Sequence, residues 1–160
     1  MKLKSSLKQW SRLLCRHLLI GSSIVLMMWG LRVSFCFNVD DSVHYAFFLA
    51  KLNPITVPRG AYVIFEHTVW GAKKRLIKKV VGIAHDEIKV RNNEVWVNET
   101  MVGKLKPSSK TRLLSPIQEK IVPEGFVFAA GTHPNSFDSR YENFGLVPIS
   151  EVLARAYPVF

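Results

Sequence analysis

A largely apolar segment lies near the start of the chain. Residues 13–31 read LLCRHLLIGSSIVLMMWGL, and the only charged residue in this run, Arg16, lies near its start. A helix needs about 20 apolar residues to cross a bilayer. The uncharged part, residues 18–31, is shorter than this, so the span has to include Arg16 and reach toward Arg32. Both arginines are tolerated there, because long cationic side chains at helix ends can extend to the headgroups. The pattern predicts a transmembrane anchor over residues 13–37, preceded by a basic tail over residues 1–12.

Two other interpretations of this segment are weaker. A cleavable signal peptide also has a basic start and a short apolar run, but the sequence VSFCFNVDD after Leu31 offers a poor small-residue cleavage site. A helix that lies on the membrane surface carries a strongly polar face, whereas this segment is apolar on all sides. A retained anchor is the favoured interpretation.

After the anchor, short runs of β-branched and aromatic residues alternate with Pro, Gly and Asn. Apolar runs of this kind, bounded by turn-forming residues, are typical of strands. Asn92-Asn93 separates two of the runs in the manner of a tight hairpin turn. The pattern predicts strands over residues 61–66, 76–83, 87–91, 94–97 and 126–130.

Helical periodicity is weak beyond residue 53. Only residues 149–155 are compatible with one or two helical turns. Residues 103–120 combine prolines with basic side chains and are expected to form a solvated loop. Residues 38–160 are thus interpreted as one mostly β domain with long loops, large enough to bury a single core.

The net charge of +10 is concentrated in the anchor region. Six of the 22 Lys and Arg residues lie within residues 1–37, together with no Asp or Glu, so the rest of the chain has 16 basic against 12 acidic side chains. A nucleic-acid-binding protein places its basic charge on the folded domain, so no nucleic-acid partner is expected. Five basic residues lie before the uncharged part of the segment, residues 18–31, and one lies just after it, which predicts that the N-terminus is in the cytoplasm and the β domain outside it.

Cysteine and histidine positions argue against a metal site. Cys15 and Cys36 lie at opposite ends of the predicted span, about 30 Å apart along a helix, too far for a disulfide. His44, His67, His85 and His133 are scattered without the spacing of metal ligands. No metal and no cofactor are expected, and nothing in the spacing favours a Ser-His-Asp triad.

Three stretches carry the candidate chemistry. The first is a turn and apolar strand over residues 58–65. In the second, residues 76–82, two lysines stand inside a strand pattern. Lys78 and Lys79 point to opposite faces of such a strand, so one of them faces apolar neighbours, an expensive place for a charge. The third, residues 131–141, is a dense polar loop, GTHPNSFDSRY, directly after an apolar strand.

In this order behind one anchor, the three stretches resemble the type I signal peptidase family of serine–lysine proteases, peptidase S26. The resemblance covers roughly residues 40–160, and its strongest part is the third stretch together with FGLVP at residues 144–148. The form of residues 133–141 is similar to the conjugal-transfer, TraF-like branch, whose members mature the pilin subunit of a conjugative pilus. The resemblance implies a signal-peptidase-like β fold behind a single N-terminal transmembrane helix.

Within this resemblance the nucleophile is Ser42. TraF-like proteins carry the serine six residues before an aromatic, and Ser42 and Phe48 keep that spacing just outside the predicted span. The proline and glycine of the family's serine box are absent, and Ser34, in or against the bilayer, is the second candidate. Asp40 stands where the family has a hydroxyl that helps to bind the oxyanion, and a carboxylate cannot donate that hydrogen bond.

Lys78 is implied as the general base. A lysine accepts a proton only when it is neutral, and lowering its pKa from about 10.4 to about 8 requires roughly 3 kcal/mol, which burial can supply. The resemblance also implies that the Ser136 hydroxyl hydrogen-bonds Lys78 and orients it. Asp138 and Arg140 are expected to pair and to hold the polar loop against the catalytic strand.

The sequence thus predicts a membrane-anchored serine endopeptidase that processes exported precursors, first among them the pilin precursor of a conjugative transfer system. Two alternatives stay open: a general signal peptidase that cleaves secretory leaders, and an inactive structural component of a conjugation or secretion apparatus. A self-cleaving repressor, which shares serine–lysine chemistry, is not favoured. It would need a cytoplasmic DNA-binding domain, and the membrane segment leaves no room for one. Expected partners are the lipid bilayer, the precursor and proteins of the apparatus. The expected location is the bacterial inner membrane, with the catalytic domain on the periplasmic side.

Overall fold

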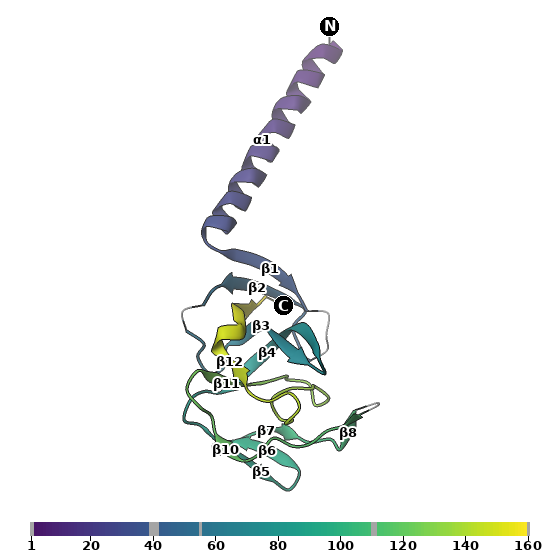
Figure 1. The fold of residues 1–160 in the computed structure, drawn as a ribbon. Coiled ribbons are helices and arrows are strands. Elements are labelled where there is room, and N and C mark those ends of the chain that lie inside the picture. The colour runs from purple at the N-terminus through teal and green to yellow at the C-terminus, as the bar shows by residue number, and fades with distance from the viewer. Residues whose placement is uncertain (1, 39–41, 55, 110–111, 160) are drawn as a thin grey trace. The chain divides into compact units, whose positions relative to one another are not determined.

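The computed structural model describes residues 2–38, 42–54, 56–109 and 112–159 (Figure 1). The chain divides into two compact units, the first ending at Ser34 and the second beginning at Phe35. Each unit is described by itself below.

The first unit is a single long helix, α1 (Lys2–Gly30). Its segment Leu13–Gly30, with mean hydropathy 1.5, is long and apolar enough to cross a membrane. The helix ends where Gly30, a poor helix former, is followed by Arg32 in the left-handed conformation at φ 54°. The expected anchor over residues 13–37 therefore contains the end of the helix and a short strand.

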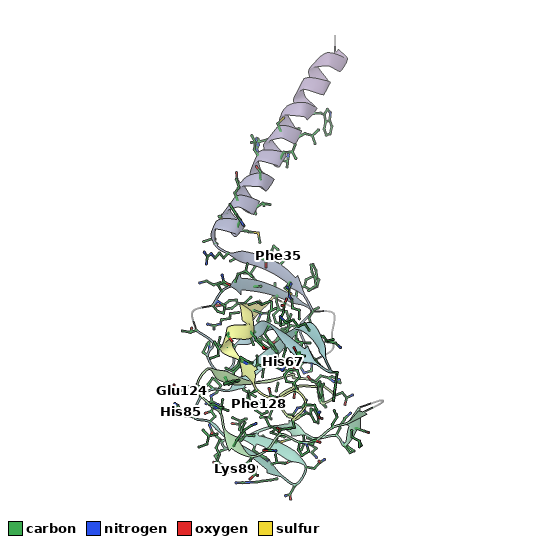
Figure 2. All side chains as sticks on the ribbon, viewed as in Figure 1. Phe35, His67, His85, Lys89, Glu124 and Phe128 are labelled. Atoms are coloured by element: carbon green, nitrogen blue, oxygen red, sulfur yellow. The ribbon has the colours of Figure 1, made fainter. Side chains whose placement is uncertain are left out.

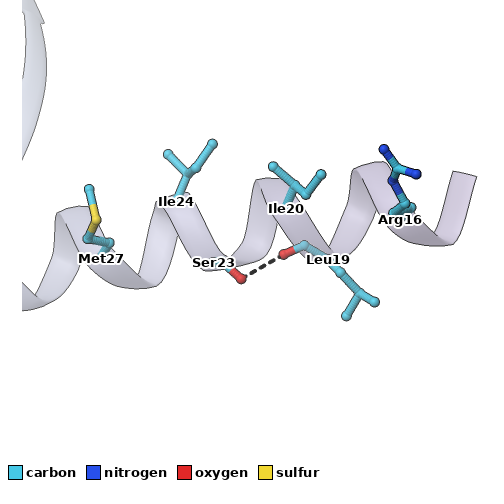
Figure 3. A pocket seen from close by; sticks show the side chains of 6 residues that line it. All are labelled: Arg16, Leu19, Ile20, Ser23, Ile24 and Met27. Carbon is cyan, nitrogen blue, oxygen red and sulfur yellow. Dashed lines mark hydrogen bonds between the residues drawn. The ribbon is translucent and has the colours of Figure 1, made fainter. Parts of the chain in front are cut away.

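A shallow hollow lies along one side of α1, and Figure 3 shows the side chains that line it. The hollow, of about 330 Å³, is lined by Arg16, three aliphatic residues, Ser23 and Met27. The Ser23 hydroxyl donates a hydrogen bond to the Leu19 carbonyl of the same helix at 2.9 Å. The hollow is thus mainly aliphatic and carries no arrangement of groups typical of catalysis.

The second unit is built on a seven-stranded sheet with the order β1-β2-β13-β3-β4-β11-β12. The pairing of β13 with β2 and β3, of β3 with β4, and of β11 with β4 and β12 is antiparallel. The strands are β1 (Val33–Phe37), β2 (Phe47–Leu52), β3 (Tyr62–Val69), β4 (Ala72–Gly82), β11 (Phe126–Ala130), β12 (Val147–Pro148) and β13 (Val152–Pro158). A 3-10 turn, η1 (Ile149–Glu151), connects β12 to β13.

A smaller sheet follows β4 in the chain and has the order β10-β5-β6-β7. Its members are β5 (Glu87–Arg91), β6 (Glu94–Val97), β7 (Thr100–Lys104) and β10 (Lys120–Ile121), and a short hairpin pairs β8 (Ser108–Ser109) with β9 (Arg112–Leu113). Asn92 and Asn93 join β5 to β6 with φ values of 49° and 65°. Two successive positive φ values are typical of the tight turn that suits the twist of a hairpin.

Three clusters of buried apolar side chains form the core. One contains residues of β5 and β6 together with Phe128 of β11, and so joins the small sheet to the large one. Phe128, labelled in Figure 2, is fully buried. The other two contain alternate residues of β3 and β4: Val63 with Val80 in one, and Ile64 with Ile77 in the other. Successive side chains of a strand point to opposite faces, so these clusters cover both faces of the large sheet.

The mostly β architecture predicted from sequence is confirmed, and three of the strand ranges, 87–91, 94–97 and 126–130, are reproduced by the structure. The helical interpretation of residues 149–155 is wrong, because only 149–151 form a 3-10 turn and β13 begins at Val152. Alanine favours helices in isolation, but here pairing with β2 and β3 on both sides decides the conformation. The region 103–120, expected to be a loop, contains the end of β7 and three short strands.

Candidate functional site

Ser42 lies in the loop that precedes β2 and is buried, with 4% of its surface exposed. Its carbonyl accepts a hydrogen bond from the backbone N–H of His133 at 3.2 Å. Two residues on, the backbone N–H of His44 donates to the Thr132 hydroxyl at 3.1 Å. The loop that carries Ser42 is therefore fastened to the segment that follows β11, although some 90 residues separate them in the chain.

Lys78 lies in the middle of β4, where it pairs with Val63 of β3. Alternation along the strand directs its side chain to the face opposite that of Ile77 and Lys79. Only 2% of Lys78 is exposed, whereas Lys79 is partly exposed. Of the two lysines expected to point apart, Lys78 is the buried one.

The polar loop after β11 meets Lys78 through Ser136. The Lys78 Nζ donates a hydrogen bond to the Ser136 Oγ at 2.9 Å, and both side chains are buried. Gly131 lies between this pair and the Ser42 loop. A Cβ built on Gly131 would come closer than 3.0 Å to the Ser136 side chain and to the Ser42 carbonyl oxygen. Ser136 and the Ser42 backbone, which lie far apart in the sequence, thus meet at Gly131, and Lys78 is joined to them through Ser136.

Asp138 and Arg140 form an ion pair inside the protein. Arg140 Nε and Nη2 donate to the two carboxylate oxygens at 2.8 and 2.9 Å, and the side chains are 2% and 0% exposed. Asp138 also accepts the backbone N–H of Gly131 at 2.8 Å. This two-point geometry is the strong form of an arginine–carboxylate contact. Together, the contacts of Asp138 with Gly131 and with Arg140 hold both ends of the loop that contains Ser136.

Arg140 extends this network to backbone groups. Its Nη2 donates to the Ser136 carbonyl at 2.9 Å, and its Nη1 donates to the Lys104 carbonyl at 3.2 Å. Burial acts to lower the pKa of the Arg140 guanidinium, but the hydrogen bonds and charge of Asp138 outweigh it, so the pKa lies above its usual value. The guanidinium therefore stays charged and continues to hold the loop.

The small sheet and the segment that follows β7 also contact the polar loop that contains Ser136. An added Cβ at Gly103 would lie 2.7 Å from Arg140 Nη1, so β7 approaches the guanidinium more closely than another residue would allow. The backbone N–H of Ile117 donates to the Arg140 carbonyl at 2.9 Å, and that of Lys106 to the Tyr141 hydroxyl at 3.2 Å. Lys104, Lys106 and Ile117 are thus joined to the polar loop by hydrogen bonds.

The turn after β4 is held by Asp86, a residue that sequence reasoning missed. Its carboxylate accepts hydrogen bonds from Arg59 Nη2 at 2.6 Å, the Ile83 backbone N–H at 2.7 Å and Asn98 Nδ2 at 2.9 Å. Burial of the carboxyl acts to raise its pKa, but these hydrogen bonds, Arg59 first, outweigh burial and lower the pKa below its usual value. Asp86 thereby joins β4 to the loop before β3 and to the end of β6.

The structure brings together Ser42, Lys78, Ser136, Asp138 and Arg140. Ser34, the second candidate nucleophile, lies in β1. Asp40 lies outside the described residues. Gly131 and Gly103 were not singled out as functional, because a close approach leaves no signal in the sequence except the glycine itself. Within the described ranges, no group of three His, Cys, Asp or Glu residues is arranged to hold a metal ion.

Comparisons with known proteins show what the chain is similar to. A family model described as "Signal peptidase, peptidase S26" matches residues 8–160. The conjugal transfer protein TraF of Agrobacterium fabrum is 31% identical over 87 residues, which are 53% of this chain and 48% of that protein. The match thus spans about half the length of that relative. A signal peptidase I from Enterococcus faecalis, solved by crystallography, matches with a TM-score of 0.41 and 23% identity, covering 64% of this chain and 98% of that one.

Proposed function

Because the chain belongs to the signal peptidase family, peptidase S26, we propose that it is a membrane-anchored serine endopeptidase with Ser42 as nucleophile and Lys78 as general base. One observation carries the proposal. Lys78 is almost fully buried in a strand, and its amine is hydrogen-bonded to a serine hydroxyl beside the Ser42 loop. Burial disfavours the ammonium form of a lysine, and the neutral amine is the form that can remove a proton.

In the proposed reaction these two residues act in turn. Lys78 removes the hydroxyl proton of Ser42 as the oxygen attacks the scissile carbonyl. The resulting ammonium then gives this proton to the departing amine, which leaves an ester between Ser42 and the new carboxyl end. Lys78 then takes a proton from water as its oxygen attacks the ester carbonyl, and the ammonium returns this proton to the Ser42 oxygen as the ester bond breaks, which releases the carboxyl product and restores the serine. The backbone N–H of Ser42 is one donor to the oxyanion.

The other residues act by positioning. Ser136 holds the Lys78 amine through its hydroxyl. The Asp138–Arg140 pair keeps the loop of Ser136 against β4. A nucleophile and base that are misplaced by about 1 Å lose about a hundredfold in rate, which is why a rigid loop matters here.

The substrate class is an exported precursor protein. The partial identity with a conjugal transfer TraF protein supports the pilin precursor of a conjugative system as the first candidate, with secretory preproteins as the alternative. The basic tail before the apolar segment and the low charge after it place the N-terminus in the cytoplasm. Ser42 then works at the outer face of the bacterial inner membrane, where exported precursors emerge.

The test is co-expression of the full chain with candidate pilin and secretory precursors, followed by mass measurement of the product. Wild type is expected to shorten a precursor, and both Ser42→Ala and Lys78→Ala to abolish the shortening. Lys79→Ala is the matched control, since this neighbouring lysine lies on the opposite face of β4, and it is expected to retain activity.

Two results of this experiment would contradict different parts of the proposal. Processing by Ser42→Ala contradicts the assigned nucleophile and directs attention to Ser34, whose alanine variant is included from the start. Absence of processing for every precursor, with the protein folded and in the membrane, contradicts the enzymatic proposal and supports a structural component of the apparatus.

A further inference from the structure

The segment that follows β11 contacts the Ser42 loop, residues 42–46, through two consecutive residues. The Thr132 hydroxyl accepts a hydrogen bond from the backbone N–H of His44 at 3.1 Å. The backbone N–H of the next residue, His133, donates to the Ser42 carbonyl at 3.2 Å. Of these two contacts, the one made by Thr132 depends on a side chain and the other does not. The Thr132 contact can therefore be removed by substitution while the His133 contact remains.

The backbone before Thr132 has a rigid support. β11 ends one residue before Gly131 and is paired with β4 up to that end. The backbone N–H of Gly131 donates to the buried Asp138 carboxylate at 2.8 Å. Asp138 is also bound by Arg140 through two hydrogen bonds. Sheet pairing and the buried ion pair therefore both fix the position from which the Thr132 side chain reaches the Ser42 loop.

The two contacts act on the peptide units on either side of Val43. A peptide unit is planar, so a hydrogen bond to its carbonyl or N–H restrains the whole plane. The Ser42 carbonyl belongs to the plane before Val43, and the His44 N–H belongs to the plane after it. Val43 itself is buried in the core, with 4% of its surface exposed. The Cα atom of Ser42, which lies in the first plane, is thereby held in place together with the point from which its hydroxyl extends.

We propose that Thr132 is a positioning residue for the nucleophile: its hydroxyl holds the backbone directly after Ser42 and so keeps the Ser42 hydroxyl aligned for attack. This role rests on the proposed peptidase function and adds a residue to it. The same loop also holds the general base, because the Lys78 amine donates to Ser136 at 2.9 Å. Residues 132–136 thus fix the nucleophile through Thr132 and the base through Ser136, and keep the two in register with each other.

Removal of the Thr132 hydroxyl is expected to affect the rate more than the stability. Thr132→Val replaces the hydroxyl by a methyl group, and His44 is exposed, so water can accept the hydrogen bond of its N–H and the fold loses little stability. A displacement of about 1 Å costs about a hundredfold in rate, and the remaining His133 contact limits the displacement, so we expect kcat to fall about tenfold with KM unchanged. Thr132→Ser keeps the hydroxyl and is expected to retain most of the wild-type kcat.

The experiment measures kcat and KM of the full chain in detergent micelles, with a precursor that wild type cleaves, for wild type, Thr132→Val and Thr132→Ser. Thr68→Val is the matched control, since Thr68 is an exposed threonine of β3, and it is expected to keep the wild-type kcat. Thermal unfolding shows the folded fraction of each variant. The role of Thr132 is overturned if Thr132→Val keeps the wild-type kcat or if Thr132→Ser loses as much as Thr132→Val. It is also overturned if the loss lies in KM alone or only follows a loss of folded protein.

Amide hydrogen exchange separates the role of Thr132 from the proposed function, because it needs no turnover. Exchange of the full chain in micelles, followed by mass spectrometry, is expected to be faster in Thr132→Val than in wild type for fragments that contain residues 42–46. It is expected to be unchanged in Thr132→Ser. If no precursor is cleaved but this difference is found, the peptidase function fails while the hold of Thr132 on the Ser42 loop stands. If precursors are cleaved but both exchange and kcat of Thr132→Val equal those of wild type, the peptidase function stands and the role of Thr132 is overturned.

Discussion

At the scale of single residues, Gly131 decides how closely the two halves of the site approach. A Cβ at this position would meet the Ser136 side chain and the Ser42 carbonyl at distances below 3.0 Å, which real Cβ atoms essentially never show. Neither neighbour can move freely. The Ser136 hydroxyl accepts a hydrogen bond from Lys78, and the Ser42 carbonyl accepts one from the backbone N–H of His133. The absence of a side chain at Gly131 is therefore a requirement of the site geometry.

We predict that Gly131→Ala lowers kcat about a hundredfold, because displacing Ser136 and Ser42 by about 1 Å misaligns nucleophile and base. Crowding of this kind also costs about 1–3 kcal/mol in the free energy of unfolding. Peptide cleavage and urea unfolding measure the two effects. Gly21→Ala in α1, where an added Cβ meets nothing within 4 Å, is the control and keeps full activity. An active Gly131→Ala protein would show that the approach is looser than the structure has it.

The Asp138–Arg140 pair gives a second prediction at this scale. Removing one member of a buried ion pair leaves the other charge without its partner and costs about 3–5 kcal/mol. Asp138→Ala and Arg140→Ala are each expected to destabilise the fold by this amount, and the double variant by less than their sum. Urea unfolding followed by tryptophan fluorescence measures all four proteins. Strict additivity would mean that the two side chains act independently, against the contacts at 2.8 and 2.9 Å.

At the scale of elements, the hairpin of β3 and β4 reaches the polar loop through its turn. Trp70 and Gly71 form this turn with φ values of 54° and 80°. A tryptophan with positive φ is uncommon, and here the ring stacks on Phe137 with centroids 4.9 Å apart and planes 19° apart. Phe137 follows Ser136, so the turn contacts the residue next to the one that holds Lys78. The stack offers a physical reason for the unusual backbone.

We predict that Trp70→Asn and Trp70→Ala are both less stable than wild type, because both lose the stack. Asparagine tolerates the left-handed conformation, whereas for alanine it costs about 1–2 kcal/mol. Trp70→Asn is therefore expected to be the more stable variant by about 1 kcal/mol. Thermal unfolding of the three proteins tests this, and equal melting temperatures for the two variants would contradict a left-handed residue at position 70.

The sequence was most informative where local chemistry decides the structure. The Asn92-Asn93 hairpin follows from its turn residues, and β11 from its aromatic and apolar run. β13 could not be recognised, because its alanines favour a helix and only the pairing with β2 and β3 overrides them. The contacts of Lys78 with Ser136 and of Asp138 with Arg140 were expected from a family resemblance, and both are present; their catalytic roles stay predictions. Gly131 and Asp86 were missed, because nothing along the chain tells what lies across from them in space.

At the scale of the whole molecule, the body depends on a few contacts that join its two sheets. Phe128 and its buried neighbours supply the apolar part. Asp86 supplies a polar part, since it binds Ile83 at the end of β4, Arg59 before β3 and Asn98 after β6. Its side chain is only 9% exposed, so these hydrogen bonds are largely shielded from water.

This arrangement predicts how stability depends on pH. The folded-state pKa of Asp86 is lowered, so the unfolded chain, with a carboxyl pKa near 3.9, binds the proton more readily. Stability from Asp86 is therefore fully present above about pH 4 and is lost as the pH falls through the lower folded-state value. Asp86→Asn is expected to be less stable than wild type at pH 7 and to lose less further stability on acidification to about pH 3.

Urea unfolding midpoints at both pH values measure the stability of Asp86→Asn and of wild type. Glu124→Gln, which changes a carboxylate that is 85% exposed, is the control and follows the wild-type profile. If Asp86→Asn lost as much stability on acidification as wild type, another carboxylate would have to carry the effect, and Asp86 would be only a packing contact between the sheets.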